Sequence, residues 1–84
     1  MIKLTLIGKP DCHLCEDARA VVQDVLAEFD PASFGLEELS ILDDPQLHEQ
    51  YVEEIPVLLI DGNVHNIWRV DPARLRSALQ GRAT

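Results

Sequence analysis

Two cysteines separated by two residues are the part of this sequence best suited to do chemistry. Cys12 and Cys15 enclose His13 and Leu14, and the chain has no other cysteine. Two thiols at this spacing can close a small disulfide ring, and a C-x-x-C between a strand and a helix is typical of redox motifs. The first interpretation is therefore dithiol chemistry at Cys12 and Cys15.

Two other interpretations of the cysteine pair stay open. Cys12, His13 and Cys15 are three potential zinc or iron–sulfur ligands, but a closed tetrahedral site needs a fourth and no second C-x-x-C exists. His48 and His65 lie far away in sequence without ligand-like spacing. We therefore expect no resident metal, and a cluster carried through Cys12 is the alternative. The thiols could also be incidental to a domain that only binds a partner.

Length and composition limit the class of protein. The 84 residues fit one domain, residues 1–84, and their 46% apolar and 26% charged content is ordinary for a globular fold. No apolar run approaches the roughly 18 residues that cross a bilayer, and the N-terminal stretch is too short for a secretory signal. We expect a cytoplasmic setting, where a close cysteine pair is more often redox-active or metal-binding than structural.

The charge of the chain is negative and uneven. The net charge is −8, and residues 11–61 hold fourteen acidic residues against one basic residue, Arg19. Such a surface excludes nucleic acids and anionic membranes as partners over most of its area. A protein partner with a basic rim fits this charge, and simple solubility is the alternative explanation.

The residues around the cysteines predict a strand followed by a helix. Alternating apolar residues indicate a strand over residues 2–7. Apolar residues at helical spacing predict a helix over residues 12–29, with Asp11 as its N-cap. The Asp30-Pro31 pair is expected to end this helix. The apolar face of the helix comprises Leu14, Ala18, Val21, Val22, Val25, Leu26 and Phe29.

The rest of the chain predicts two further strands, a hairpin and two helices. A strand is expected over residues 36–41, and Asp44-Pro45 is typical of a helix start. Residues 57–60 form a continuous apolar strand, which the Asp61-Gly62 turn signal joins to a returning strand over 64–68. A last helix should begin at Asp71-Pro72 and stop near Gly81.

These elements predict an α/β fold in the order β-α-β-α-β-β-α. The first two strands should be parallel through a right-handed crossover, and the last two must be antiparallel because two residues can only make a hairpin. The result is a four-stranded mixed sheet flanked by helices.

In this order and with these motifs, the chain resembles a short glutaredoxin-like protein of the thioredoxin fold. The resemblance covers nearly all of the chain. Its markers are the strand 4–7, the segment 9–15, the Ile55-Pro56-Val57 step and the Asp61-Gly62 hairpin. It implies a thiol–disulfide oxidoreductase in which Cys12 is the attacking thiol and Cys15 the resolving thiol.

The resemblance also implies where a substrate would bind. Pro56 would be cis and face the cysteines, and Ile55 would offer backbone groups to an extended substrate. Trp68 could form a wall of the substrate groove or cover the core. Arg69 could steer an acidic substrate group or be solvated. The resemblance places Asp71 at the position of an acid that helps glutaredoxins to hold glutathione, although its first role is that of a helix cap.

The chain departs from the family pattern at two places. The residues between the cysteines are His13 and Leu14, where glutaredoxins commonly have proline and an aromatic residue. The Gly-Gly pair that commonly precedes the last helix is absent, and Trp68 and Arg69 lie where the backbone would have to approach a ligand closely. No cofactor is therefore expected, and glutathione is in doubt as a bound ligand. The expected substrate is a disulfide-containing protein or glutathione, and a thiol reductase or glutathione would restore the dithiol.

The reactivity of Cys12 depends on opposing charges. A free cysteine has a pKa of about 8.5, and the unpaired N–H groups of a helix N-terminus stabilise a thiolate. Lys9 and a protonated His13 could add positive charge. Three acids near in sequence oppose a second negative charge: Asp11, Glu16 and Asp17. We therefore expect a moderately lowered pKa for Cys12.

Overall fold

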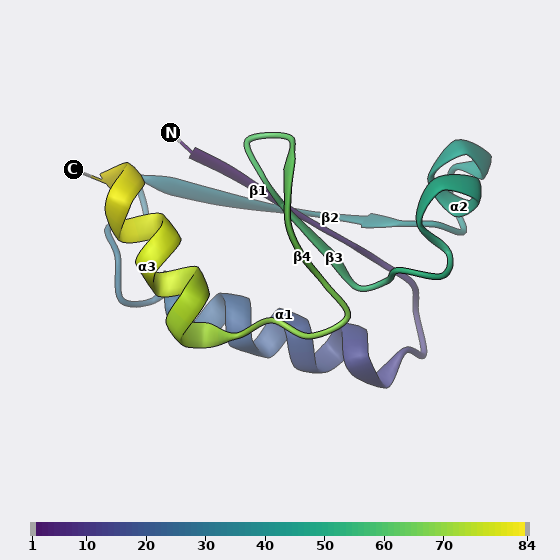
Figure 1. Ribbon diagram of the computed structural model, residues 1–84, viewed down its shortest axis with the longest axis horizontal. Coiled ribbons are helices and arrows are strands. Elements are labelled where there is room, and N and C mark those ends of the chain that lie inside the picture. The colour runs from purple at the N-terminus through teal and green to yellow at the C-terminus, as the bar shows by residue number, and fades with distance from the viewer. Residues whose placement is uncertain (1, 84) are drawn as a thin grey trace.

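A computed structural model describes residues 2–83 and has the predicted order of elements (Figure 1). The elements are β1 (Ile2–Gly8), α1 (His13–Leu26), β2 (Phe34–Ser40), α2 (Pro45–Tyr51), β3 (Val57–Ile60), β4 (Asn63–Ile67) and α3 (Pro72–Ala83). None of these helices has the length and apolar content that a membrane crossing requires.

The four strands form one mixed sheet in the order β2-β1-β3-β4. β1 runs parallel to β2 and antiparallel to β3, and β3 pairs antiparallel with β4. This confirms the predicted α/β class. The hairpin turns at Asp61 and Gly62, whose φ angles are 50° and 84°, the left-handed values that a tight two-residue turn favours.

The register of the sheet brings three distant segments to one of its ends. Val57 pairs with Ile7 of β1 on one side and with Ile67 of β4 on the other. One position beyond these pairs, each segment continues with Gly8, Pro56 or Trp68. The Trp68 N–H donates a hydrogen bond to the Pro56 carbonyl at 2.8 Å.

The helices cover the two faces of the sheet unequally. α1 and α3 lie together on one face, and the short α2 lies at one end of the other (Figure 1). The main core joins β1 and β3 to these two helices through residues such as Leu4, Leu58, Val22, Leu75 and Leu79, which have 0% exposure. Burying each such side chain contributes about 1.5–3 kcal/mol. The smaller core joins Ile7, Ile41 and Val57 to the inner side of α2.

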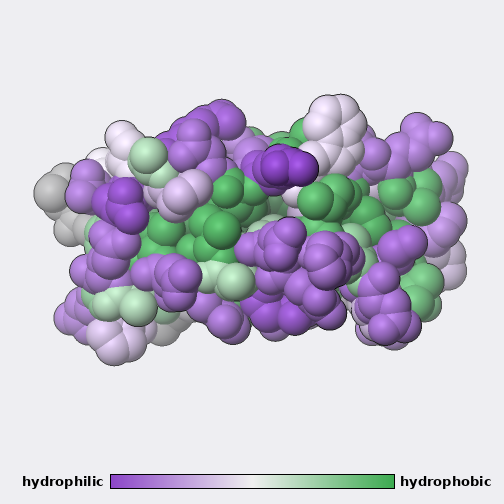
Figure 2. Space-filling view, turned by 90° about the horizontal axis from the view of Figure 1, so that it is seen from below, coloured by the Kyte–Doolittle hydropathy of each residue, from purple (hydrophilic) through white to green (hydrophobic). Residues whose placement is uncertain are grey.

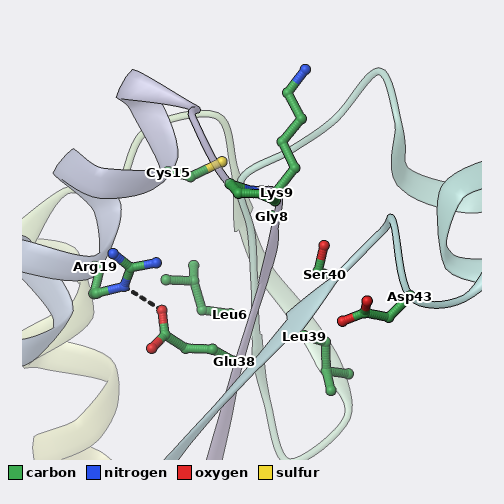
Figure 3. A pocket seen from close by; sticks show the side chains of 10 residues that line it. Leu6, Gly8, Lys9, Cys15, Arg19, Glu38, Leu39, Ser40 and Asp43 are labelled. Atoms are coloured by element: carbon green, nitrogen blue, oxygen red, sulfur yellow. Dashed lines mark hydrogen bonds and ion pairs between the residues drawn. The ribbon is translucent and has the colours of Figure 1, made fainter.

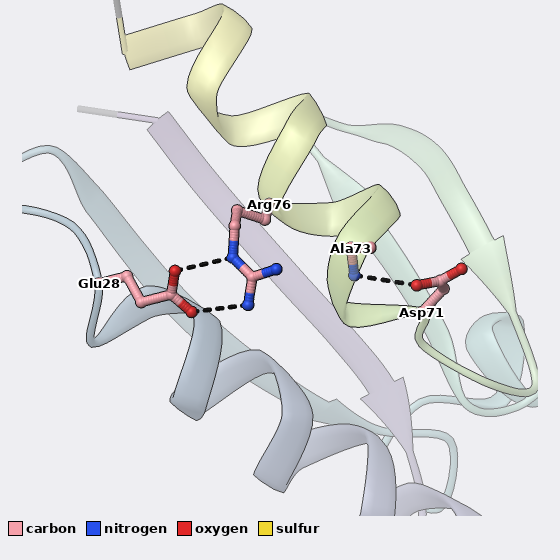
Figure 4. Close-up of polar contacts among 4 residues, drawn as sticks. All are labelled: Glu28, Asp71, Ala73 and Arg76. Atoms are coloured by element: carbon pink, nitrogen blue, oxygen red, sulfur yellow. Dashed lines mark hydrogen bonds and ion pairs between the residues drawn. The ribbon is translucent and has the colours of Figure 1, made fainter.

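An ion pair links α1 to α3 on the surface. Arg76 of α3 donates two hydrogen bonds to the Glu28 carboxylate just after α1, at 2.7 and 2.8 Å (Figure 4). These hydrogen bonds lower the pKa of Glu28 below its usual 4.5 and raise the pKa of Arg76. An ion pair therefore joins the two helices on this face in addition to their apolar contacts.

The predicted limits of the first helix were wrong at both ends. Its N-cap is Cys12 and not Asp11, because Asp11 adopts a left-handed φ of 58° and the extended Cys12 is the last residue before the helix. The helix ends at Leu26 and not at residue 29. The Glu28 and Phe29 N–H groups bond to carbonyls three residues back, so the last turn tightens and stops.

The limits of three other elements also differ from the predicted ones. β2 begins at Phe34, two residues early, because its buried ring packs edge-to-face on Phe29 with centroids 5.1 Å apart. β4 ends at Ile67, so Trp68 lies in the following turn. α3 continues through Gly81 to Ala83, since one glycine costs a helix only about 1 kcal/mol.

Candidate functional site

The two cysteines lie at the N-terminus of α1 and are joined as a disulfide. Their Cα atoms are 5.2 Å apart. Cys12 is the N-cap residue, and its Sγ accepts a hydrogen bond from the Cys15 N–H at 3.2 Å. Cys12 is half-buried, whereas only 3% of Cys15 is exposed. The helix therefore presents one sulfur toward solvent and keeps the other beneath it.

Gly8 makes room for the buried sulfur. A Cβ atom at this position would lie 2.8 Å from the Cys15 Sγ and 3.2 Å from its Cβ. Both distances are shorter than ordinary van der Waals contact, so a larger residue would displace Cys15 or the strand. No pattern in the sequence indicated this contact.

The segment before β3 supports the site from the neighbouring strand. The Ile55–Pro56 peptide is cis. Pro56 is fully buried and directly precedes Val57, the residue of β3 that pairs with Ile7 of β1. Ile55 is half-buried, and its N–H already donates to the Tyr51 carbonyl at 3.1 Å. Only the carbonyl of Ile55 therefore remains for the expected backbone contact with a substrate.

Trp68 occupies an unusual turn beside this segment. Its φ is 67°, and the Arg69 N–H donates to the Ile67 carbonyl at 2.9 Å, which closes a three-residue γ-turn. Such a turn with positive φ at its centre is rare and strained for a non-glycine residue. The indole Nε1–H donates to the Glu53 carbonyl at 3.1 Å, while 53% of the residue stays exposed. The ring is thus fixed at one end and open to solvent.

The side chain of Asn66 stabilises the same turn through a hydrogen bond. Its side-chain amide donates to the Arg69 carbonyl at 2.6 Å. Its Oδ1 is buried and has no hydrogen-bond partner among residues 2–83. The Asn66 side chain therefore stabilises the turn at Trp68, a role that an asparagine in a strand does not reveal from sequence.

A cavity of about 280 Å³ opens beside Cys15 on the β2 side of α1 (Figure 3). Lys9 lines it and points outward, and Arg19 pairs with Glu38 across its wall. The hydrogen bond from Arg19 to Glu38 raises the pKa of Arg19. Trp68 does not line this cavity, so Lys9 lies on a different side of the helix from Trp68.

A second, smaller groove of about 170 Å³ lies between α1 and the turn at Trp68. It is lined by Leu14, Asp17, Ala18, Val21, Trp68, Arg69 and Val70. Leu14 was predicted on the inner face of the helix, but 39% of it is exposed. This groove thus contains Trp68 and Arg69, two of the candidate residues for contact with a substrate.

Two other candidate residues lie outside both cavities. His13 is exposed in the first turn of α1. Asp71 accepts a hydrogen bond from the Ala73 N–H at 2.9 Å (Figure 4) and a second from the Arg74 N–H at 3.4 Å, so it caps α3 as expected. Within the described chain, no three His, Cys, Asp or Glu side chains are grouped so that they could hold a metal ion.

Comparison with known proteins places this geometry in a family. Residues 3–80 match the model of the glutaredoxin-like domain (DUF836). The chain belongs to this glutaredoxin-like family. A Methanocaldococcus jannaschii protein named Thioredoxin is 28% identical over 82 residues, which cover 96% of this chain and 95% of that protein. The Mycobacterium tuberculosis protein Rv0508 is 26% identical over 77 residues, covering 89% and 79% of the two chains.

Solved structures of two bacterial proteins have the same fold as this glutaredoxin-like domain. The X-ray structure of XcR50 from X. campestris has a TM-score of 0.75 and 31% identity, and the match covers 93% of this chain and 96% of that one. The solution structure of Ne2328 from Nitrosomonas europaea also has a TM-score of 0.75, at 24% identity, with 92% and 89% covered. The chain is thus a glutaredoxin-like domain of the thioredoxin fold with a close cysteine pair.

Proposed function

We propose that this glutaredoxin-like domain is a thiol–disulfide oxidoreductase that works through Cys12 and Cys15. The observation that carries the proposal is the position of the disulfide at the start of α1, with Cys12 half-buried and Cys15 buried. A helix N-terminus stabilises the thiolate that exchange requires. The difference in burial favours Cys12 as the sulfur that meets the substrate.

The proposed reaction has two exchange steps. The Cys12 thiolate attacks one sulfur of a substrate disulfide, forming a mixed disulfide and releasing the other substrate sulfur as a thiolate. Cys15 then loses its proton and attacks the Cys12 Sγ, which releases the second substrate sulfur. Two electrons pass from the dithiol to the substrate, and the Cys12–Cys15 disulfide remains.

A thiol donor must restore the dithiol after each cycle. We propose that the donor is glutathione or the dithiol of a protein reductase, and that the cycle runs in the cytoplasm, where such thiols are kept reduced. The bulky Trp68 and Arg69, in place of a Gly-Gly pair, argue against a bound glutathione. Glutathione would then act as a diffusing reductant and not as a held cofactor.

Mutation of each cysteine tests the proposal. Cys12→Ser should abolish turnover with a disulfide substrate, because no attacking thiolate remains. Cys15→Ser should accumulate a mixed disulfide, visible as an increase in mass, because the resolving step is lost. The unaltered protein should show a reduction potential between about −120 and −300 mV. The proposal fails if the oxidised protein exchanges with neither glutathione nor a reductase dithiol.

A further inference from the structure

The second exchange step needs a proton acceptor that the cysteine pair does not itself supply. Cys15 must lose its proton as its Sγ attacks Cys12. Only 3% of Cys15 is exposed, and a thiol in apolar surroundings holds its proton more tightly than a free one. The groups that surround Cys15 therefore decide where this proton goes.

The cavity on the β2 side of α1 connects Cys15 to ionisable groups. Its volume of about 280 Å³ is enough for several water molecules, since each occupies about 30 Å³ in the liquid. Charged residues line it from each element around Cys15: Lys9 from the loop before α1, Arg19 from α1, Glu38 from β2 and Asp43 from the loop after β2. Two carboxylates, those of Glu38 and Asp43, are thus candidate proton acceptors.

The register of β2 directs Glu38 toward this cavity. Alternate residues of a strand share one face of the sheet. On the face of β2 that meets α1, Phe34 and Leu36 belong to the main core or pack against it. The next two residues on this face, Glu38 and Ser40, line the cavity, and Ser40 pairs with Gly8, which makes room for the buried sulfur. The face therefore changes from apolar to polar where it approaches that sulfur.

Arg19 fixes the Glu38 carboxylate on the side of the helix that carries Cys15. Arg19 follows Cys15 by four residues, so both lie on one side of α1, and the Arg19 Nε donates a hydrogen bond to Glu38 Oε1 (Figure 3). The Glu38 side chain is 44% exposed, so it borders both the cavity and bulk water. Asp43 forms no ion pair in the part of the chain that the structure describes.

The position of Glu38, and not its charge alone, distinguishes it from the other acids. Figure 2 shows hydrophilic side chains on either side of an apolar strip on the face covered by α1 and α3, so polar groups are common on the surface. Glu37 lies on the opposite face of the sheet and pairs with Lys3 at 2.8 Å. Its side chain is also 44% exposed. The two neighbouring glutamates therefore differ mainly in the face of the sheet that they occupy.

We propose that Glu38, fixed by Arg19, accepts the proton of Cys15 through water in this cavity as Cys15 attacks the mixed disulfide. The S–H bond of Cys15 breaks and the Cys12–Cys15 bond forms. The bond between Cys12 and the substrate sulfur breaks, and its electron pair stays on the substrate sulfur. Glu38 then passes the proton to bulk water. The inference rests on the proposed function and assigns to Glu38 the positioning of the proton path in its second step.

The reagent dithiobis(nitrobenzoate) measures the two exchange steps separately. Attack by Cys12 of the reduced protein releases one coloured thionitrobenzoate anion and leaves the other group bound to Cys12. Attack by Cys15 then releases the second anion. The first phase of colour release accelerates with the reagent concentration, whereas the second phase does not depend on it. Cys15→Ser should lack the second phase, which assigns that phase to Cys15.

Glu38→Gln should slow the second phase and leave the first. We expect a loss of about 10- to 100-fold near neutral pH, at or below the lower end of the usual general-base effect because water intervenes. Removing a negative charge near Cys15 would by itself favour the thiolate, so electrostatics alone predicts the opposite change. The loss should shrink as the pH rises past the ordinary thiol pKa of about 8.5, since hydroxide then removes the proton.

Three further variants complete the test. Glu38→Asp keeps a carboxylate and should recover most of the rate of the second phase. Glu37→Gln removes the same group and breaks the corresponding ion pair on the other face of the sheet, and it should retain the rate. Asp43→Asn removes the other carboxylate of the cavity and should also retain it.

The outcomes separate this inference from the proposed function. The role of Glu38 is overturned if Glu38→Gln retains the second-phase rate near neutral pH, or slows it equally at every pH as a structural defect would. An equal loss in Glu37→Gln or Asp43→Asn would also overturn it, while the redox function stands. If the unaltered protein releases no second thionitrobenzoate anion, the exchange between Cys12 and Cys15 is itself overturned.

Discussion

At the scale of single residues, the site depends on close packing around the buried sulfur. Gly8 and Cys15 belong to different elements, yet nothing larger than a hydrogen atom fits between the Gly8 Cα and the sulfur. Trp68 and Asn66 form the other side of the site through hydrogen bonds to backbone carbonyls. The geometry of the cysteine pair is therefore maintained by neighbouring residues that carry no thiol.

Gly8→Ala should destabilise the fold by about 1–3 kcal/mol, the usual cost of overfilling a packed interior. The added methyl group would lie 2.8 Å from the Cys15 Sγ. Urea denaturation of the oxidised protein measures the free energy of unfolding. Gly81→Ala is the control, because nothing described lies within 4 Å of its added Cβ, and it should stabilise the exposed helix by up to about 1 kcal/mol. Equal effects of the two substitutions would contradict the packing argument.

At the scale of elements, the start of α1 and the start of α3 carry the functional geometry. Cys12 caps α1 and Asp71 caps α3, and both helices pack on the same face of the sheet. The Glu28–Arg76 ion pair connects them at a distance from the cysteines. The orientation of the groove between α1 and the turn before α3 therefore depends on how these two helices are joined.

Removing the acid of this pair should have a pH-dependent effect. The pKa of Glu28 is lowered in the folded state, so the pair stabilises the fold fully above the usual value of 4.5 and loses this contribution as the pH falls through the folded-state pKa. Glu28→Gln should therefore lower the free energy of unfolding slightly at pH 7 and not at pH 2. Denaturation at both pH values measures this. Glu49→Gln, at an exposed position of α2 without an ion pair in the described chain, should show no such difference.

Asp71→Ala should lower the free energy of unfolding by about 1 kcal/mol, the usual effect of losing an N-cap. The carboxylate accepts the Ala73 and Arg74 N–H bonds, and alanine cannot replace it. Asp71→Asn should retain most of the stability, because its amide oxygen accepts the same bonds. Thermal unfolding of both variants separates the capping role from a role of the charge.

The elements themselves could be predicted from the sequence because their signals are local. Apolar periodicity, the Asp-Pro helix starts and the Asp61-Gly62 turn each act within a few residues. Leu14 was misplaced because its spacing fits the buried face, although side chains in a first turn lean toward the open N-terminal end of the helix. The Gly8–Cys15 contact and the hydrogen bond from Trp68 to the Glu53 carbonyl could not be predicted, since each joins different elements of the chain. The Asn66–Arg69 hydrogen bond spans only three residues, but it depends on the positive φ of Trp68, which no sequence signal indicates.

At the scale of the whole molecule, acidic and basic residues are concentrated in different parts of the chain. The acidic residues lie mainly in the first two thirds of the chain and the basic ones in α3 and the strand ends. The positive charges of this basic region act on His65 of β4. Burial lowers the pKa of His65 below its usual 6.5, and Arg74 and Arg82 of α3 lower it further.

The stability of the fold should consequently fall as the medium becomes mildly acidic. Since the folded-state pKa of His65 lies below 6.5, the unfolded chain binds the proton more readily, and stability decreases as the pH drops below that value. Unfolding free energies measured from about pH 7.5 to about pH 5 should show this slope, a range in which few carboxylates titrate. His65→Gln should flatten the slope, and His48→Gln, exposed on α2, should not.

The sequence contains one tryptophan, and it lies half-exposed in the groove that Leu14, between the two cysteines, also lines. Its fluorescence is therefore an intrinsic optical reporter of this one region, without any attached dye. A change in the emission on reduction of Cys12–Cys15 would report the redox state of the pair, and a shift to shorter wavelength would report an apolar molecule that covers the indole.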